Sequence, residues 1–142
     1  MAYTPFQADV LSPGGQVFSG EVQQISTRTV SGELGVLRKH QPLLGRLEAG
    51  ELRLYLPEDG EVKRFVQTGG YIQVAGDTGV LLLVDEAFPV EEYDRADAED
   101  RQAKAVARLE QSEPGTEQHR LALAGKKRAD ALVKLADTLE KR

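Results

Sequence analysis

From Phe6 to about Val84, short runs of alternating hydrophobic and polar residues are separated by turn residues. Phe6, Ala8 and Val10 alternate with polar neighbours, and the run ends at the Ser-Pro-Gly-Gly sequence of residues 12–15. An alternation with period two is typical of strands that have one buried face, and Gly and Pro favour turns. Further strands are expected on the same grounds at residues 52–56, 62–68, 71–74 and 80–84.

These strands predict an all-β N-terminal sandwich of about ten short antiparallel strands. Strands at a spacing of roughly 8–12 residues favour a sandwich or barrel, because a small antiparallel sheet must pack its apolar face on a second sheet. Residues 80–84 (Val-Leu-Leu-Leu-Val) are apolar on both faces, so this strand is expected in the middle of a sheet.

After Phe88 the chain is rich in helix-forming residues, and glycine is absent until Gly115. A first helix is predicted, with Glu91, Glu92 and Asp94 in its first turn, where carboxylates complement the helix dipole. It should end near Gln111. Residues 112–115 form a turn, and Thr116 is a suitable cap for a second helix that runs to the C-terminus. The chain therefore divides into a sandwich domain at residues 1–88 and an antiparallel two-helix hairpin at 89–142.

The hairpin should be held weakly, because its expected apolar stripes contain few large side chains. On the first helix the stripe is Ala96, Ala103, Val106 and Ala107; on the second it is Leu121, Gly125, Leu132, Leu135, Ala136 and Leu139. A narrow apolar contact makes a second conformation of the hairpin credible.

The charge of the chain is unevenly distributed. The formal net charge is −5. Residues 1–116 contain 11 Lys and Arg and 19 Asp and Glu, a charge of −8, whereas residues 117–142 contain 7 and 4, a charge of +3. An acidic body with a basic tail suggests that the tail binds an acidic surface, although an ordinary solvated helix has the same pattern. Nucleic acid is disfavoured, because the body repels phosphate and the tail has no aromatic residue for stacking.

Several classes of chemistry are absent from the sequence. There is no cysteine, which excludes disulfides and thiolate sites, and two histidines, His40 and His119, are too few for a multi-histidine metal site. The Gly-Lys-Lys at 125–127 lacks the earlier glycine and the hydroxyl of a phosphate-binding loop. No apolar run is long enough to span a bilayer, and no secretory signal is recognised. A binding or regulatory protein without a cofactor is expected, not an enzyme.

A specific motif lies at residues 32–44. GELGVL at 32–37 and HQPLL at 40–44 resemble the GELG-(I/V)-(L/Y)-x-x-H-x-P-(L/V) signature of the epsilon subunits of F-type ATP synthases. Four further segments occur in the same order as in the family: VLSP at 10–13, VFSG at 17–20, LEAGELRL at 47–54 and FVQTGGYIQV at 65–74. The family combines a β-sandwich with a helical hairpin, so the resemblance covers essentially the whole chain. Taken alone, the glycines and His40 would indicate only a tight turn and a loop.

The resemblance implies a central-stalk subunit that couples the gamma shaft to the c subunits of the membrane rotor ring during proton-driven ATP synthesis. The residues expected to contact the ring are Ser31, Gly32, Glu33, His40 and Gln41. Such a subunit lies peripherally on the cytoplasmic side of the bacterial plasma membrane and reaches the membrane only through the complex.

The resemblance also implies that the hairpin blocks ATP hydrolysis when its basic residues meet an acidic segment of the catalytic beta subunits. The available cations are Arg101, Lys104, Arg108, Arg120, Lys126, Lys127, Arg128 and Lys134. Some family members bind ATP through an I/L-D-x-x-R-A-K pattern. Here Arg95 and Ala96 match and Glu92 is a possible substitute for the aspartate, but Asp97 replaces the lysine and would repel phosphate. Arg95 is therefore expected to be an ordinary surface residue or to form an intrahelical ion pair. An ATP-sensing variant and an unrelated sandwich adaptor remain the alternatives.

Overall fold

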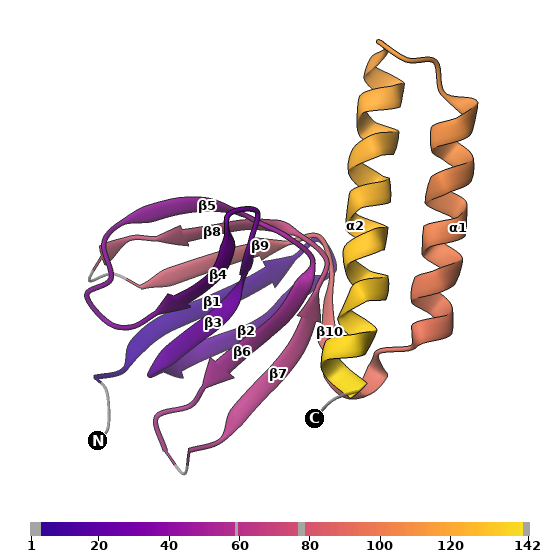
Figure 1. Ribbon diagram of the computed structural model, residues 1–142. Helices are drawn as coiled ribbons and strands as arrows, with labels where there is room; N and C mark the ends of the chain where they lie inside the picture. The colour runs from indigo at the N-terminus through magenta and orange to yellow at the C-terminus, as the bar shows by residue number, and fades with distance from the viewer. Residues whose placement is uncertain (1–3, 59, 77–78, 141–142) are drawn as a thin grey trace. The chain divides into compact units, whose positions relative to one another are not determined.

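The computed structural model describes residues 4–58, 60–76 and 79–140. Within these residues the chain forms ten strands, a short 3-10 helix and two α-helices (Figure 1). The strands are β1 Phe6–Ser12, β2 Gly15–Val22, β3 Gln24–Thr29, β4 Gly32–Val36, β5 Leu43–Leu47, β6 Gly50–Tyr55, β7 Val62–Gln67, β8 Gly70–Val74, β9 Val80–Val84 and β10 Ala87–Pro89. The helices are η2 Val90–Glu92, α1 Arg95–Gln111 and α2 Glu117–Glu140.

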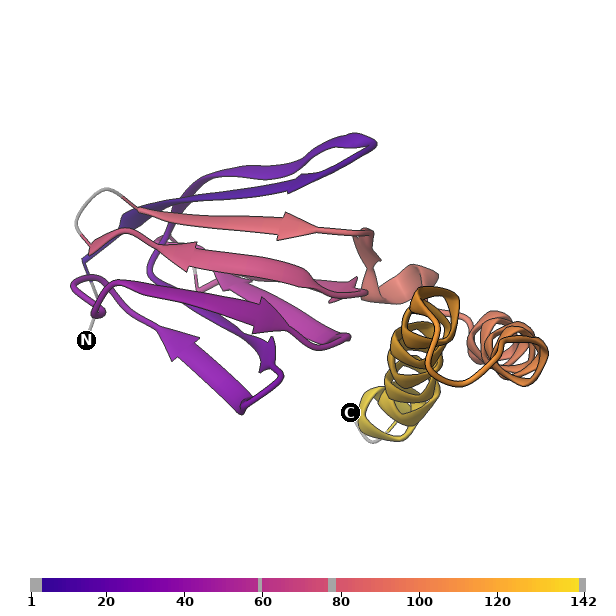
Figure 2. The ribbon, with the colours of Figure 1, turned by 90° about the horizontal axis from the view of Figure 1, so that it is seen from above.

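The strands form one sheet that folds back on itself into two layers (Figures 1 and 2). The strand order is β10-β7-β6-β3-β5-β8-β9-β1-β2, and β4 pairs with the other side of β3. The sheet passes from one layer to the other where Thr29 of β3 pairs with Leu47 of β5. The sandwich prediction is confirmed, as is the central place of β9 between β8 and β1. The expectation of purely antiparallel pairing was wrong at one ladder, because β1 and β9 run parallel.

The core lies between the two layers. Ile25, Leu52 and Leu54 from one layer and Ile72 and Leu82 from the other have no solvent-exposed surface. Along β6 and β9, inward and outward residues alternate in burial as the pleat of a strand requires. The alternation fixes which side chains face solvent on both outer faces of the sandwich.

One buried polar side chain secures the end of β7. Gln67 is fully buried, its Nε2 donates to the carbonyl of Glu48 at 2.6 Å, and its Oε1 accepts from the backbone N–H of Gly69 at 2.7 Å. Among the described residues no buried side-chain nitrogen or oxygen lacks a hydrogen-bond partner. The turns at this end of the sandwich are therefore fixed by satisfied polar groups as well as by packing.

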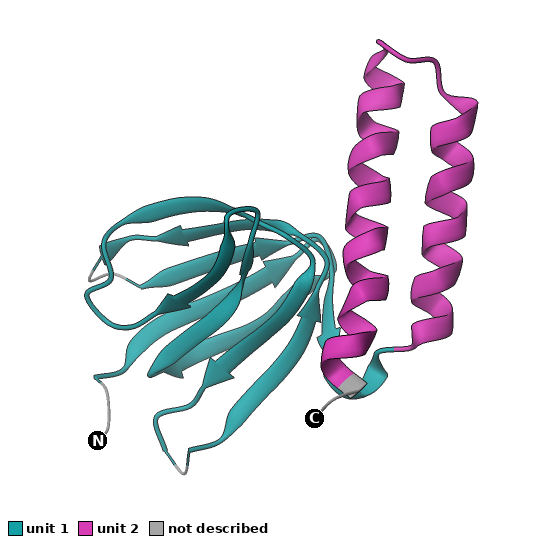
Figure 3. Cartoon of the chain, in the orientation of Figure 1, with its two compact units in different colours: residues 1–93 teal, residues 94–142 magenta. Residues whose placement is uncertain are grey.

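The chain divides into two compact units, residues 1–93 and 94–142 (Figure 3). The sequence placed the boundary after Phe88. In the structure, β10 pairs Phe88 with Val66 and Pro89 with Phe65, so the strands continue past that point. The first helix also begins later than expected: Glu91 and Glu92 lie in η2, and α1 starts at Arg95. Asp94 caps α1 instead, because its carboxylate accepts from Ala96 N at 3.0 Å.

The second unit is the predicted antiparallel hairpin. As expected, α1 ends at Gln111 and Thr116 caps α2, with its Oγ1 accepting from His119 N at 3.1 Å. The stripe predicted on α1 was wrong: Ala96, Ala103 and Ala107 are exposed, and Val106 is half-buried. The buried residues of α1 are Ala98 and Ala105, with Ser112 one heptad further on. An alanine-rich helix has apolar residues on several faces, so its own sequence does not determine which face meets the partner.

Two hydrogen bonds set the register of the hairpin. Gln102 Nε2 donates to Asp130 Oδ1 at 2.8 Å, and Ser112 Oγ is 2.9 Å from His119 Nδ1. On α2, Leu132, Leu135 and Ala136 of the predicted stripe are buried, whereas Leu121 is 58% exposed. Apart from Leu132 and Leu135, the buried apolar residues of the described hairpin are alanines, in agreement with a weakly held hairpin.

We expect acid to weaken the hairpin through Asp130. Hydrogen bonds from Lys126 and then Gln102 lower the pKa of this carboxyl. A lowered folded-state pKa contributes stability above the unfolded value of about 4, and this contribution is lost as the pH falls through the folded pKa. The helical melting temperature, followed by far-ultraviolet circular dichroism, should fall in the wild type below about pH 4 and should fall less in Asp130→Asn. Asp137→Asn, at an exposed aspartate of the same helix, is the matched control. An equal acid response in wild type and Asp130→Asn would contradict this role.

Candidate functional site

The turn between β3 and β4 holds three of the residues expected at the ring contact: Ser31, Gly32 and Glu33. Gly32 has a φ of +122°, a value that side-chain-bearing residues rarely adopt. The Thr29 hydroxyl donates to the Gly32 carbonyl at 2.9 Å and accepts from the Ser31 N–H at 3.1 Å. Val30, which directly precedes Ser31, is 59% exposed. The turn is thus a small, internally bonded projection with a hydrophobic residue at its tip.

Arg28 links the carboxylate of Glu33 to a neighbouring turn. Its Nη1 lies 3.3 Å from Glu33 Oε1, and its Nε lies 2.5 Å from Glu48 Oε2. The hydrogen bond to Glu48, with a further contribution from Glu33, raises the pKa of Arg28. Gly50 lets the two turns approach, since a Cβ there would lie 3.2 Å from Arg28 Cβ. We call Arg28, Glu33 and Glu48 the charged clamp.

The sequence analysis missed Arg28 and Glu48. The signal for Arg28 was present, because a two-residue turn at Val30 and Ser31 pairs Arg28 directly with Glu33 across the hairpin. Glu48 comes from a turn of β5 and β6, and its approach depends on the fold of the whole sheet, not on local sequence.

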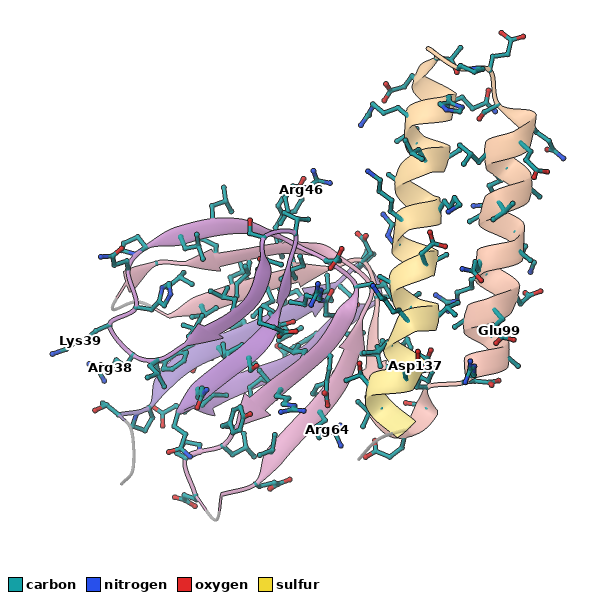
Figure 4. All side chains as sticks on the ribbon, in the orientation of Figure 1. Arg38, Lys39, Arg46, Arg64, Glu99 and Asp137 are labelled. Atoms are coloured by element: carbon teal, nitrogen blue, oxygen red, sulfur yellow. The ribbon has the colours of Figure 1, made fainter. Side chains whose placement is uncertain are left out.

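His40 and Gln41 lie at the opposite end of β4 from this turn. The strand has five residues, which at about 3.4 Å each separates its ends by roughly 17 Å. Figure 4 shows Arg46 at the end of the sandwich that bears the β3–β4 turn, and Arg38 and Lys39 at the other end. The five expected ring-contact residues thus form two groups, at opposite ends of β4.

The loop around His40 has its own constraints. Lys39 has a φ of +70°, which is uncommon for a residue with a side chain. His40 N donates to the Leu37 carbonyl at 3.1 Å, and His40 Nδ1 lies 2.7 Å from the carbonyl of Gln41. Because a carbonyl only accepts, Nδ1 must carry a proton in this geometry. The loop holds the imidazole in one orientation.

Four of the eight hairpin cations are paired within their own helices. Arg101 pairs with Asp97 and Lys104 with Asp100, each at 3.0 Å; Lys126 pairs with Asp130 at 2.8 Å, and Arg120 pairs with Glu117. These are pairs at i,i+3 or i,i+4, which support a helix modestly. Arg128 also has an interaction partner.

Arg108, Lys127 and Lys134 make no ion pair within the part of the chain that the structure describes. Lys127 and Lys134 are exposed and seven residues apart on α2, and exposed Arg120 precedes Lys127 by the same interval. Residues seven apart lie on one side of a helix. We call Arg120, Lys127 and Lys134 the basic stripe.

The two residues considered for ATP binding belong to different units. Glu92 lies in η2 and is exposed, and Arg95 is the first residue of α1. Arg95 Nε lies 3.2 Å from Glu99 Oε1, so of the two expected roles of Arg95 the structure shows the intrahelical ion pair. The carboxylates of Asp94, Asp97 and Glu99 in the first turns of α1 disfavour a phosphate group there.

Two further findings concern membranes and metals. Neither described helix combines the length and the hydrophobicity that crossing a bilayer requires. In residues 4–58, 60–76 and 79–140, no three His, Asp or Glu side chains are grouped so that they could hold a metal ion.

Comparison with known proteins identifies the sandwich. Residues 5–90 match the family model of the ATP synthase delta/epsilon chain β-sandwich domain. The ATP synthase epsilon chain of Persephonella marina is 38% identical over 132 residues, which cover 92% of this chain and 96% of the relative. That of Sulfurihydrogenibium sp. is 35% identical over 131 residues, with the same coverage of both chains.

Solved structures agree at the level of the fold. A chain of the Euglena gracilis mitochondrial ATP synthase structure, OSCP/F1/c-ring, matches with a TM-score of 0.67 at 24% identity and covers 99% of this chain and 82% of that chain. A chain of the Tetrahymena thermophila mitochondrial ATP synthase central stalk and c-ring matches with a TM-score of 0.59 at 19% identity and covers 94% of this chain and 98% of that chain. With matches that include the hairpin as well as the sandwich, the chain belongs to the epsilon chain family of ATP synthases.

Proposed function

We propose that this protein is a non-catalytic central-stalk subunit of a rotary ATP synthase, that its sandwich couples the gamma shaft to the rotor ring, and that its hairpin inhibits ATP hydrolysis. The observation that supports this most strongly is the likeness to epsilon chains over 92% of the chain, which includes the hairpin as well as the sandwich. The subunit would lie peripherally on the cytoplasmic face of a bacterial plasma membrane and reach the membrane through the complex.

The β3–β4 turn is the proposed contact with the polar loops of the c subunits. It projects from the sheet, it carries exposed Glu33, and the charged clamp holds that carboxylate toward a second turn. Loop residues on a rigid scaffold commonly carry function. His40 and Gln41, one strand length away, form a second contact with the ring in this proposal.

The basic stripe of α2 is the proposed contact with the catalytic beta subunits in the inhibited state. The stripe is exposed, and two of its three cations make no ion pair among the described residues, so an acidic segment can bind them without first breaking a pair. Because the described hairpin buries only two leucines besides its alanines, its helices can release at modest cost. ATP is not part of this proposal, because Arg95 is paired and Asp97 opposes a phosphate.

Reversing two charges of the basic stripe should release ATP hydrolysis. Lys127→Glu with Lys134→Glu removes two cations and adds two repulsive charges. Exposed pairs contribute about 0.2–1 kcal/mol each, so the loss of two pairs should weaken inhibition roughly two- to thirtyfold. The measurement is steady-state hydrolysis by an alpha–beta–gamma head with added subunit at low salt; raised salt should weaken inhibition by the wild type in the same direction.

Arg38→Glu with Lys39→Glu is the matched control for that experiment. This variant changes the net charge by the same amount, but both of its residues lie on the sandwich. The alpha–beta–gamma head contains no rotor ring that these residues could contact. If the control releases hydrolysis as strongly as the stripe variant, or the stripe variant inhibits like the wild type, the basic stripe is not the inhibitory contact.

The clamp should matter for coupling in the complete synthase. Glu33→Gln should lower ATP-driven proton pumping in reconstituted vesicles. Arg28→Gln should lower pumping less, about two- to fivefold, because it frees the Glu33 carboxylate without removing it. His40→Ala, tested separately, shows whether the group of His40 and Gln41 also contributes to coupling. Glu61→Gln, at an exposed loop carboxylate, is the control. Pumping that is unchanged in Glu33→Gln, with normal assembly, would exclude the β3–β4 turn as the ring contact.

A further inference from the structure

Gln67 is a buried polar side chain among the apolar residues of the sandwich. It is the last residue of β7 and has no solvent-exposed surface, although its amide carries two hydrogen-bond donors and an acceptor. Phe65, two residues earlier and therefore on the same face of the strand, packs against the core. The amide thus points into the sandwich, where a polar group is costly unless it is hydrogen-bonded.

The amide of Gln67 joins three other segments of the chain. Its Nε2 donates to the carbonyl of Glu48, in the turn between β5 and β6, at 2.6 Å and to Thr27 Oγ1 of β3 at 3.4 Å. Its Oε1 accepts from the N–H of Gly69, in the turn between β7 and β8, at 2.7 Å. The Thr27 hydroxyl in turn donates to the carbonyl of Glu51 at 3.2 Å. A buried network in which every member is bonded fixes one arrangement of the segments that it joins.

Two of these segments carry the charged clamp. Successive side chains of a strand point to opposite faces, so buried Thr27 meets Gln67 inside the sandwich while exposed Arg28 faces outward. Glu48 is held in three ways: its N–H donates to the Arg28 carbonyl at 3.1 Å, its carbonyl accepts from Gln67, and its carboxylate accepts from Arg28 Nε at 2.5 Å. Glu33, the third clamp residue, lies opposite Arg28 in the β3–β4 ladder. The buried amide therefore contacts the backbone of one clamp residue and the sequence neighbour of another.

An apolar side chain of similar size would fill this space but would not hold the two turns. Without the amide, the buried N–H of Gly69 would lose its acceptor, and the carbonyl of Glu48 would lose a short hydrogen bond. A buried polar group left unpaired is costly, so the turns would shift to reach other partners or water. The volume of residue 67 therefore serves the core, and its hydrogen bonds serve the turns.

We propose that Gln67 is a positioning residue for the ring contact: from inside the sandwich it holds the β5–β6 turn at Glu48, and through that turn the charged clamp that carries Glu33. This inference rests on the proposed function, in which Glu33 meets the c subunits. Gln67 is fully buried and cannot contact the ring itself. Its effect on coupling is transmitted by the clamp.

The first measurement uses the isolated full-length chain and does not depend on the proposed function. Gln67→Met keeps nearly the volume of the side chain and removes its hydrogen bonds. In heteronuclear NMR of this variant, the Arg28 Nε–H should exchange with water about two- to fivefold faster than in the wild type, the factor that an exposed ion pair contributes. The Nε–H of Arg64, which donates to Glu51 at 2.5 Å, is the control within the molecule and should exchange at the wild-type rate.

Val10→Ala is the matched control variant. Val10 is fully buried in β1, and its truncation destabilises the sandwich without removing a hydrogen bond of the network. The melting temperature of this control should fall, but its Arg28 exchange should not change. If Gln67→Met does not unfold cooperatively, Gln67→Asn takes its place, because the shorter side chain cannot reach both turns.

The second measurement is ATP-driven proton pumping by the complete synthase in reconstituted vesicles. Gln67→Met should lower pumping about two- to fivefold, as Arg28→Gln does, because both substitutions release Glu33 from the clamp. Combining the two substitutions should lower pumping no further than either alone, since they act on the same contact. A residue with only a structural role would instead add its own effect to that of Arg28→Gln.

The outcomes separate this inference from the proposed function. Arg28 exchange that is unchanged in folded Gln67→Met, or that rises equally in Val10→Ala, overturns the inference whatever the pumping shows. An additive loss in the double variant also overturns it, as does unchanged pumping in Gln67→Met when Glu33→Gln lowers pumping. If neither Gln67 variant folds, the residue is required for the fold itself, and a positioning role is overturned. If Arg28 exchange rises as expected but Glu33→Gln leaves pumping unchanged, the proposed ring contact fails, and the role of Gln67 in that contact fails with it.

Discussion

The packed interior between the two layers of the sandwich is the interaction on which the other features depend. Residues such as Ile25, Leu54, Ile72 and Leu82 are fully buried there, and burying an aliphatic side chain contributes about 1.5–3 kcal/mol. Their positions fix the register of every strand, because a shift by one residue would turn the apolar set outward. With the register fixed, Leu44, Tyr71 and Leu83 must face solvent, and Arg28 must lie opposite Glu33.

The hairpin is stabilised differently from the sandwich. Among its described residues, four alanines and two leucines, Leu132 and Leu135, make up the buried apolar set, and the polar pairs Gln102–Asp130 and Ser112–His119 link its helices. A net hydrogen bond contributes about 0.5–1.5 kcal/mol, so each such contact is worth less than one buried leucine. The rigid unit is suited to transmitting force and the weaker one to changing conformation, which is the division of roles that the proposed function requires.

Much of the fold could be predicted from local sequence. The alternation around Phe6–Val10 and 52–56, and the fully apolar run at 80–84, predicted strands where β1, β6 and β9 occur. The buried face of α1 could not be predicted, because it depends on contacts with α2 that are distant in sequence. Ser31 and His40 were grouped because one motif contains both. Strand β4 separates them, and only the completed sheet reveals that separation.

The most direct test is a density map, at side-chain resolution, of an assembled ATP synthase that contains this chain. The sandwich should contact the ring through the β3–β4 turn, and in the inhibited state the basic stripe of α2 should contact a beta subunit. A map in which Glu33 faces solvent while the ring binds elsewhere on the sandwich, or in which Lys127 and Lys134 face solvent in the inhibited state, would contradict the assignment of these surfaces.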